Sequence, residues 1–102
     1  MDRAGSSTVA VAATSTLVLP ARVRQFAGRP QRIAFSITNY SAVVIYLNLS
    51  NSEPAAAGYG IPLYPGTTLM DSNSEKYECW QGTISAIEAG AVGTLAVWER
   101  VA

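Results

Sequence analysis

Apolar and polar residues alternate along most of the chain after residue 16, which is the period-two pattern of half-buried β-strands. In residues 33–38, Ile33, Phe35 and Ile37 alternate with smaller or polar residues, and residues 43–49 continue with Val43, Ile45, Leu47 and Leu49 on one face. No stretch has the three-to-four residue spacing of an amphipathic helix of useful length. The pattern therefore predicts strands throughout.

Turn residues separate the predicted strands. Pro20 confines the strand that starts at Leu17 to a sheet edge or a bulge, and residues 50–60 have the composition of a loop. Tyr64-Pro65-Gly66-Thr67 places Pro and Gly as a type II turn requires, between short strands at 61–63 and 67–70. We also expect a hairpin from residues 83–88 to residues 94–101, joined by residues 89–93.

Several short strands at regular spacing predict an all-β fold, an antiparallel β-sandwich that is jelly-roll-like, over residues 17–102. Residues 1–16 are small and polar with little to bury. We interpret them as a flexible N-terminal arm, or as a segment ordered only by contact with a neighbouring molecule. The chain is long enough for one hydrophobic core and too short for two.

A second set of apolar residues stands opposite the predicted core residues. Val44 and Tyr46 do so on one strand, and Ala96 and Trp98 on another. If both sets are covered, the second set packs against another sheet face or another molecule. The corner at residues 60–69 has two interpretations. It is either a structural turn of the sandwich, or a rigid binding loop that presents Leu63 and Tyr64 to a partner.

Charged residues make up 14% of the chain, against about 25% in ordinary soluble domains. A surface with so little charge favours a partner that covers part of it. Residues 1–32 carry five arginines and one aspartate, whereas residues 33–102 carry two basic and six acidic residues. This basic first third and the acidic remainder are suited to pair within the fold or between subunits. Arginines 22, 24, 29 and 32 lack aromatic interleaving and a nucleic-acid motif, which argues against nucleic acid as the partner.

The residues that usually carry catalysis or bind metals are few. The chain has no histidine and only one cysteine, Cys79, so a zinc cluster and an imidazole base are excluded. No G-x-S-x-G motif occurs, and the glycine-rich segments lack the ending of a phosphate loop. No apolar run approaches the roughly 18 residues of a membrane span. We expect no enzyme activity, no cofactor, no bound metal and no membrane partner.

The order "RIAFSITNYSAVVIYLNLSN", "GIPLYPGTTL" and "YECWQGTISAIEAGAVGTLAVWE" resembles small virion proteins of tailed bacteriophages. The resemblance covers about residues 32–100 and rests on turn and hairpin features. It implies a capsid decoration (cement) protein, a head-fibre base or a minor tail protein, with no catalytic residues to transfer. The implied location is the virion, on the outer surface of the capsid, after synthesis in the host cytoplasm.

From these observations we expect a non-enzymatic decoration protein that binds across major capsid protein subunits, stabilises the head and associates with copies of itself. The expected contact residues are Arg22, Arg24, Val44, Tyr46, Leu63, Tyr64 and Trp98. The alternative is a carbohydrate- or receptor-binding module on a fibre or tail, in which Tyr40, Tyr59, Tyr64 and Trp80 stack on sugars. Aromatic residues gathered in one groove favour the sugar site, whereas dispersed or buried ones favour the decoration protein.

Overall fold

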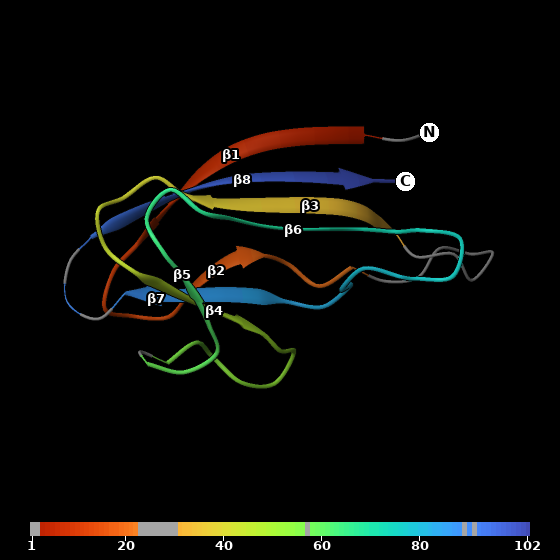
Figure 1. Cartoon of the computed structure of the whole chain (residues 1–102). Helices are drawn as coiled ribbons and strands as arrows, with labels where there is room; N and C mark the ends of the chain where they lie inside the picture. Colours follow the sequence, from red (N-terminus) through yellow and green to blue (C-terminus); the bar gives the residue numbers. More distant parts are fainter. Residues whose placement is uncertain (1–2, 23–30, 57, 89, 91) are drawn as a thin grey trace.

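The computed structural model describes residues 3–22, 31–56, 58–88, 90 and 92–102, and in this part of the chain every regular element is a β-strand. The eight strands form two four-stranded antiparallel sheets that pack as the layers of a sandwich (Figure 1). The strands are β1 (Arg3–Val11), β2 (Thr16–Leu19), β3 (Arg32–Asn39), β4 (Ile45–Leu49), β5 (Ile61–Leu63), β6 (Thr68–Ser72), β7 (Ile84–Glu88) and β8 (Gly93–Val101).

The strand orders are β1-β8-β3-β6 in one sheet and β2-β7-β4-β5 in the other. Strand β1 therefore pairs with β8, β2 with β7, β3 with β6 and β4 with β5. This is the order produced when one long hairpin wraps into a jelly roll of two sheets. The predicted fold class is confirmed.

The core lies between the sheets and is built from alternate residues of the inner strands. Phe35 and Ile37 of β3, Ile45 and Leu47 of β4, and Leu95 of β8 are almost completely buried. Since neighbouring residues of a strand point to opposite faces, Tyr46, Ala96 and Trp98 lie on outer faces. The alternation in the sequence thus predicted the core strands correctly.

The N-terminal segment differs from the arm that we expected. Residues 3–11 form β1, which pairs with β8 along its full length, from Arg3 opposite Val101 to Val11 opposite Gly93. Val11 is fully buried and Val9 packs against the core, whereas residues 4–8 are exposed. Residues 4–8 therefore bury little side-chain surface, and this part of the strand is held mainly by its antiparallel backbone pairing with β8.

The expected hairpin of residues 83–101 is wrong. Strand β7 pairs with β2 and β4, and β8 pairs with β1 and β3, so the two strands belong to different sheets. The chain crosses from one sheet to the other after β7. Gly93 at the start of β8 lies so close to the opposite sheet that a Cβ there would approach Ile45 Cδ1 to 2.9 Å. Period-two alternation identified both strands but not their partners.

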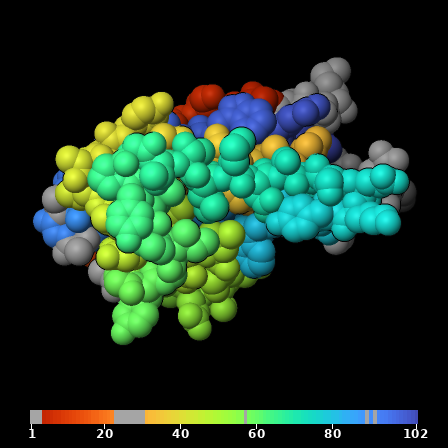
Figure 2. Space-filling view, viewed as in Figure 1, coloured from red at the N-terminus to blue at the C-terminus, as the bar shows by residue number. Residues whose placement is uncertain are grey.

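The corner after β5 has the predicted turn. Gly66 has a φ of +78°, and the amide of Thr67 donates to the carbonyl of Tyr64 at 3.1 Å. The edge position predicted from Pro20 is also confirmed, since β2 is an edge strand with an irregular register between Leu17 and Leu19 and ends before the proline. Figure 2 shows the segment between β4 and β5, in yellow-green to green, projecting from the lower side of the molecule.

Candidate binding face and internal arginine cluster

The residues expected to contact a partner do not form one surface. Tyr46 lies on the outer face of the β2-β7-β4-β5 sheet, and Trp98 on the outer face of the other sheet. Both side chains are half-buried, as is Val44 just before β4. Arg24 lies outside the described residues. The sandwich therefore separates the apolar residues that sequence analysis grouped as one second face.

The corner residues divide between interior and surface. Leu63 is 5% exposed and belongs to the hydrophobic core, so its expected role as a contact residue is wrong. A side chain sealed between the sheets cannot touch a partner. Tyr64, the next residue, is 57% exposed and remains available for contact. The buried Asn39 side chain fixes this corner by donating to the carbonyls of Val43 at 2.7 Å and Leu63 at 2.8 Å.

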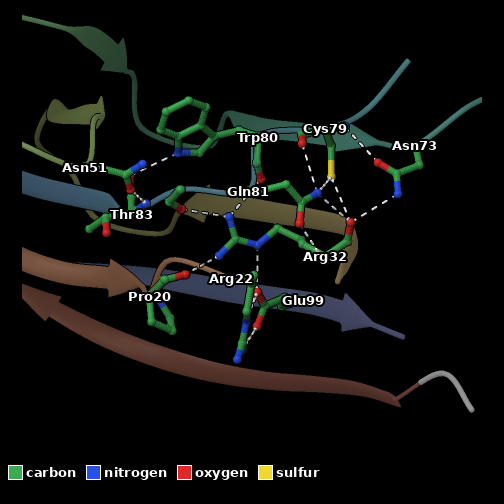
Figure 3. Close-up of polar contacts among 11 residues, drawn as sticks. Pro20, Arg22, Arg32, Asn51, Asn73, Cys79, Trp80, Gln81, Thr83 and Glu99 are labelled. Atoms are coloured by element: carbon green, nitrogen blue, oxygen red, sulfur yellow. Dashed lines mark hydrogen bonds and ion pairs between the residues drawn. The ribbon is translucent and has the colours of Figure 1, made fainter. Parts of the chain in front are cut away.

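Arg22, Arg32 and Glu99, which we call the arginine cluster, gather between the sheets at one end of the sandwich (Figure 3). Arg32 is fully buried, and its Nε donates to Glu99 Oε2 at 2.7 Å. Its Nη1 donates to the carbonyls of Trp80 at 2.9 Å and Gly82 at 3.0 Å, and its Nη2 donates to the carbonyl of Pro20. One guanidinium thus joins β3, β8 and two loops.

Arg22 completes the cluster by approaching the same carboxylate with two donors. Its Nε donates to Glu99 Oε2 at 3.0 Å, and its Nη2 donates to Glu99 Oε1. Burial raises the pKa of Glu99, but the hydrogen bonds and charges of the two arginines outweigh that effect and hold the pKa below its ordinary value of 4.5. The hydrogen bond to Glu99 in turn raises the pKa of Arg22.

The backbone of Arg32 is held as firmly as its side chain. Its amide donates to Gln81 Oε1 at 2.8 Å, and its carbonyl accepts from Gln81 Nε2 at 2.8 Å and from Asn73 Nδ2 at 3.1 Å. The buried Cys79 thiol packs here too, and desolvation raises its pKa. A thiol whose ionised form is disfavoured is a poor nucleophile. The polar groups of the cluster hydrogen-bond to other parts of the protein, so the cluster holds β3, β8 and two loops together.

Basic residues of the first third of the sequence therefore pair with an acidic residue of the remainder within the fold, as one of our two interpretations held. Sequence analysis missed the role of Arg32, because arginine at the start of a strand is usually a surface residue. Among the described residues, no group of three or more His, Cys, Asp or Glu is placed to hold a metal ion. No helix in this part of the chain is long and apolar enough to cross a membrane.

The outer face of the β1-β8-β3-β6 sheet, which we call the Trp98 face, differs from the internal arginine cluster in its polar groups. Trp98 and Ala96 of β8 lie beside Ser6 and Thr8 of β1, with the hydroxyl residues of β3 on the other side. A shallow groove runs over this face, and its lining is Ser6, Ser7, Thr8, Ser36, Thr38, Tyr40, Ala96, Val97 and Trp98. Figure 2 shows side chains of β8, in blue, reaching the surface next to those of β1, in red.

No charged side chain lines this groove within the part of the chain that the structure describes. The face offers a half-buried indole, several hydroxyl groups and, near its borders, Tyr40 and Met70, which are 74% and 71% exposed. The hydroxyl groups of Thr38 and Thr68 form a hydrogen bond between β3 and β6, with 2.7 Å between the two Oγ1 atoms. Such a surface is able to pack against and hydrogen-bond a neutral partner, and it carries no group suited to move protons.

The chain matches no family model, no curated protein and no solved structure in the three comparisons made.

The aromatic residues proposed for sugar stacking are dispersed. Trp80 packs against the core, and its indole Nε1 donates to the carbonyl of Thr83 at 3.0 Å. Tyr59 belongs to the loop before β5, and Tyr64 to the turn after it. Of the four, Tyr40 alone lines the groove beside Trp98 among the described residues. The four aromatic residues therefore do not gather in one groove.

Proposed function

We propose that this protein is a non-enzymatic virion component, a decoration protein that binds across major capsid protein subunits on the outer surface of a phage head. The observation that carries the proposal is the groove of the Trp98 face, which is lined by Trp98 and, among the described residues, by no charged side chain. Interface centres are depleted of charge and enriched in aromatic residues. The jelly roll itself also occurs in viral capsid domains, although it hosts other functions and adds support only by analogy.

The physical effect of such a protein is stabilisation by mass action. A ligand that binds the assembled shell, and not the separated subunits, shifts the equilibrium away from disassembly. Contacts to two or more shell subunits are multivalent, so that weak individual contacts together give firm attachment. Trp98 supplies the kind of rigid, partly buried anchor that dominates many interfaces. No catalytic step is needed for this role.

The test uses heads of the virus that encodes the chain, prepared without this protein. Purified protein is added, the heads are sedimented, and bound protein is measured together with the temperature at which heads disassemble. The proposal expects saturable binding and a higher disassembly temperature. Absence of binding at concentrations well above those of the capsid subunits would reject it.

A second candidate, a carbohydrate-binding module, is favoured by one observation. The hydroxyl groups of Ser6, Thr8, Ser36 and Thr38 surround Trp98, and an indole beside hydroxyl groups is suited to the apolar face and hydroxyls of a neutral sugar. Titration with neutral oligosaccharides, followed by tryptophan fluorescence, distinguishes the two. A saturable change that Trp98→Ala abolishes would favour the sugar, and an unchanged spectrum would favour the capsid.

A further inference from the structure

A sandwich of two open sheets has four edge strands, which here are β1, β6, β2 and β5. An edge strand exposes backbone donors and acceptors, and natural proteins usually protect it from pairing with other chains. Short length, proline, bulges and inward-pointing charges are the usual protections. An edge strand without these protections is open to pairing with a strand of another molecule.

Three of the edges carry these protections. Strand β5 has only three residues and contains Pro62, and β2 has four residues, a register irregularity and Pro20 directly after it. Strand β6 has five residues and contains Asp71, which is paired opposite the inward-facing Phe35. The Asp71 carboxylate also accepts a hydrogen bond from the Tyr77 hydroxyl at 2.7 Å.

Strand β1 lacks all of them. It has nine residues, RAGSSTVAV, with no proline, no bulge against β8 and no charge after Arg3. No other strand of the described chain pairs with its outer edge. Residues 4–8 are exposed, so the fold leaves both the edge and the side chains of this half-strand uncovered.

We propose that β1 pairs in antiparallel fashion with β1 of a second copy of this chain, so that two four-stranded sheets become one eight-stranded sheet. A two-fold axis at Ser7 gives full overlap, with Ser7 opposite Ser7, Ser6 opposite Thr8 and Gly5 opposite Val9. Residues directly opposite each other in an antiparallel pair share a face, and these pairs do. The interface is isologous, as in most homodimers.

The sequence of β1 is compatible with antiparallel pairing to a second β1. No like charges confront each other between residues 4 and 10, and the larger Val9 meets Gly5, where an added Cβ would find nothing within 4 Å in the free chain. A strand added to an edge is held mainly by main-chain hydrogen bonds, so the partner strand must be free of charge repulsion and steric conflict along residues 4–10. A second copy always supplies such a strand.

The pairing has a consequence for the Trp98 face. A two-fold axis perpendicular to the sheet keeps both Trp98 faces on the same side of the dimer. The two β8 strands then lie about 14 Å apart, since neighbouring strands are about 4.8 Å apart. The dimer would present two copies of the uncharged groove to one surface, which increases avidity. The pairing itself holds whether or not that surface is a capsid.

The first experiment measures the dimer dissociation constant by analytical ultracentrifugation. Ser6→Lys with Thr8→Lys places two like-charged pairs across the axis, whereas Ser6→Glu with Thr8→Lys places two opposite-charged pairs there. We expect the first variant to weaken the dimer at least about tenfold and the second to restore it. Ser72→Lys, on the exposed outer side of β6, is the matched control and should leave the dimer unchanged.

The variant with Ser6→Glu and Thr8→Lys also controls for misfolding. Both double variants place two charged residues at the same positions of β1, so a difference between their dissociation constants reflects the sign of the charges and not damage to the strand. A wild-type protein that is monomeric at tens of micromolar would overturn the proposal. So would equal dissociation constants for the two double variants, or a dimer broken by Ser72→Lys. None of these results depends on heads, so failure here is distinct from failure of the proposed function.

A second experiment tests the register directly. Cα atoms of directly opposite residues in an antiparallel pair lie about 4.5–5.5 Å apart, within the range that a disulfide spans. Mild oxidation of Ser7→Cys should therefore give a covalent dimer, while Ser72→Cys should not. The native Cys79 is buried and does not compete. Equal cross-linking of the two variants would contradict the pairing at Ser7.

Discussion

The arginine cluster and the Trp98 face use polar groups in opposite ways. In the cluster, two arginines and one carboxylate are drawn between the sheets and bonded to each other and to backbone carbonyls. On the Trp98 face, hydroxyl groups and an indole are directed outward, and charge is absent from the groove among the described residues. Here the charged groups stabilise the fold, and the neutral groups are left for contact.

This difference explains how a chain with little charge yields a candidate interface. The three charged residues of the cluster stabilise one another, so they contribute little to the outside surface. A groove lined by hydroxyl, aromatic and small apolar side chains costs less to desolvate than a charged one. Substitutions in the arginine cluster are therefore expected to change folding stability, and substitutions in the groove of the Trp98 face are expected to change binding.

The largest effect is expected from Arg32→Met, which removes the buried guanidinium. Glu99 loses one of its two arginines, and the carbonyls of Trp80 and Gly82 lose a donor. Breaking a buried ion pair from one side costs about 3–5 kcal/mol, and urea unfolding measures the loss. Arg22→Met is the control, since Arg22 is partly exposed and should cost less. Equal losses of unfolding free energy in the two variants would contradict a larger structural role for the buried arginine.

The next effect concerns the two neighbours at the corner. Leu63→Ala should cost about 2–5 kcal/mol of unfolding free energy because Leu63 is in the core. Tyr64→Ala should change stability by no more than about 0.5 kcal/mol, because its side chain is exposed. Urea unfolding of both variants tests the division. A stable Leu63→Ala protein that fails to bind heads would restore the contact role that the structure contradicts.

A smaller effect is expected from pH. The pKa of Glu99 is lower in the folded protein than its ordinary value, so its ionised form stabilises the fold above that value. This contribution is lost as pH falls from about 5 through the lowered folded pKa. Unfolding free energies across this range should therefore decline, and Glu99→Gln should decline less steeply. Parallel curves for the two proteins would contradict the assignment.

Much of the fold was predictable from the sequence because large apolar residues mark it. Phe35, Ile37, Ile45 and Leu47 are in the core, as their alternation indicates. Strand β1 was missed because its alternation is carried by small residues, which give little contrast between faces. Residues 8–11, TVAV, held the one available signal, since three of the four are β-branched and Val9 and Val11 fall on the same face of a strand.

The candidate site was less predictable, since it depends on which strands become neighbours. Tyr46 and Trp98 have the same sequence signature, yet the wrapping of the jelly roll puts them on opposite sides of the molecule. The hydroxyl residues around Trp98 come from β1 and β3, which are distant in the sequence. Trp98 itself was correctly singled out as an outward-facing residue, while its role in binding stays a prediction.

The most direct measurement places one charge on the Trp98 face and records folding and binding together. Ala96 lies in the groove beside Trp98, and Ala96→Glu should leave the urea midpoint nearly unchanged because the site is on an outer face. We predict that this variant loses occupancy on heads prepared without the protein, while the neutral control Ala96→Ser retains it. Full occupancy by Ala96→Glu, with an unchanged midpoint, would contradict the claim that the uncharged groove makes the contact.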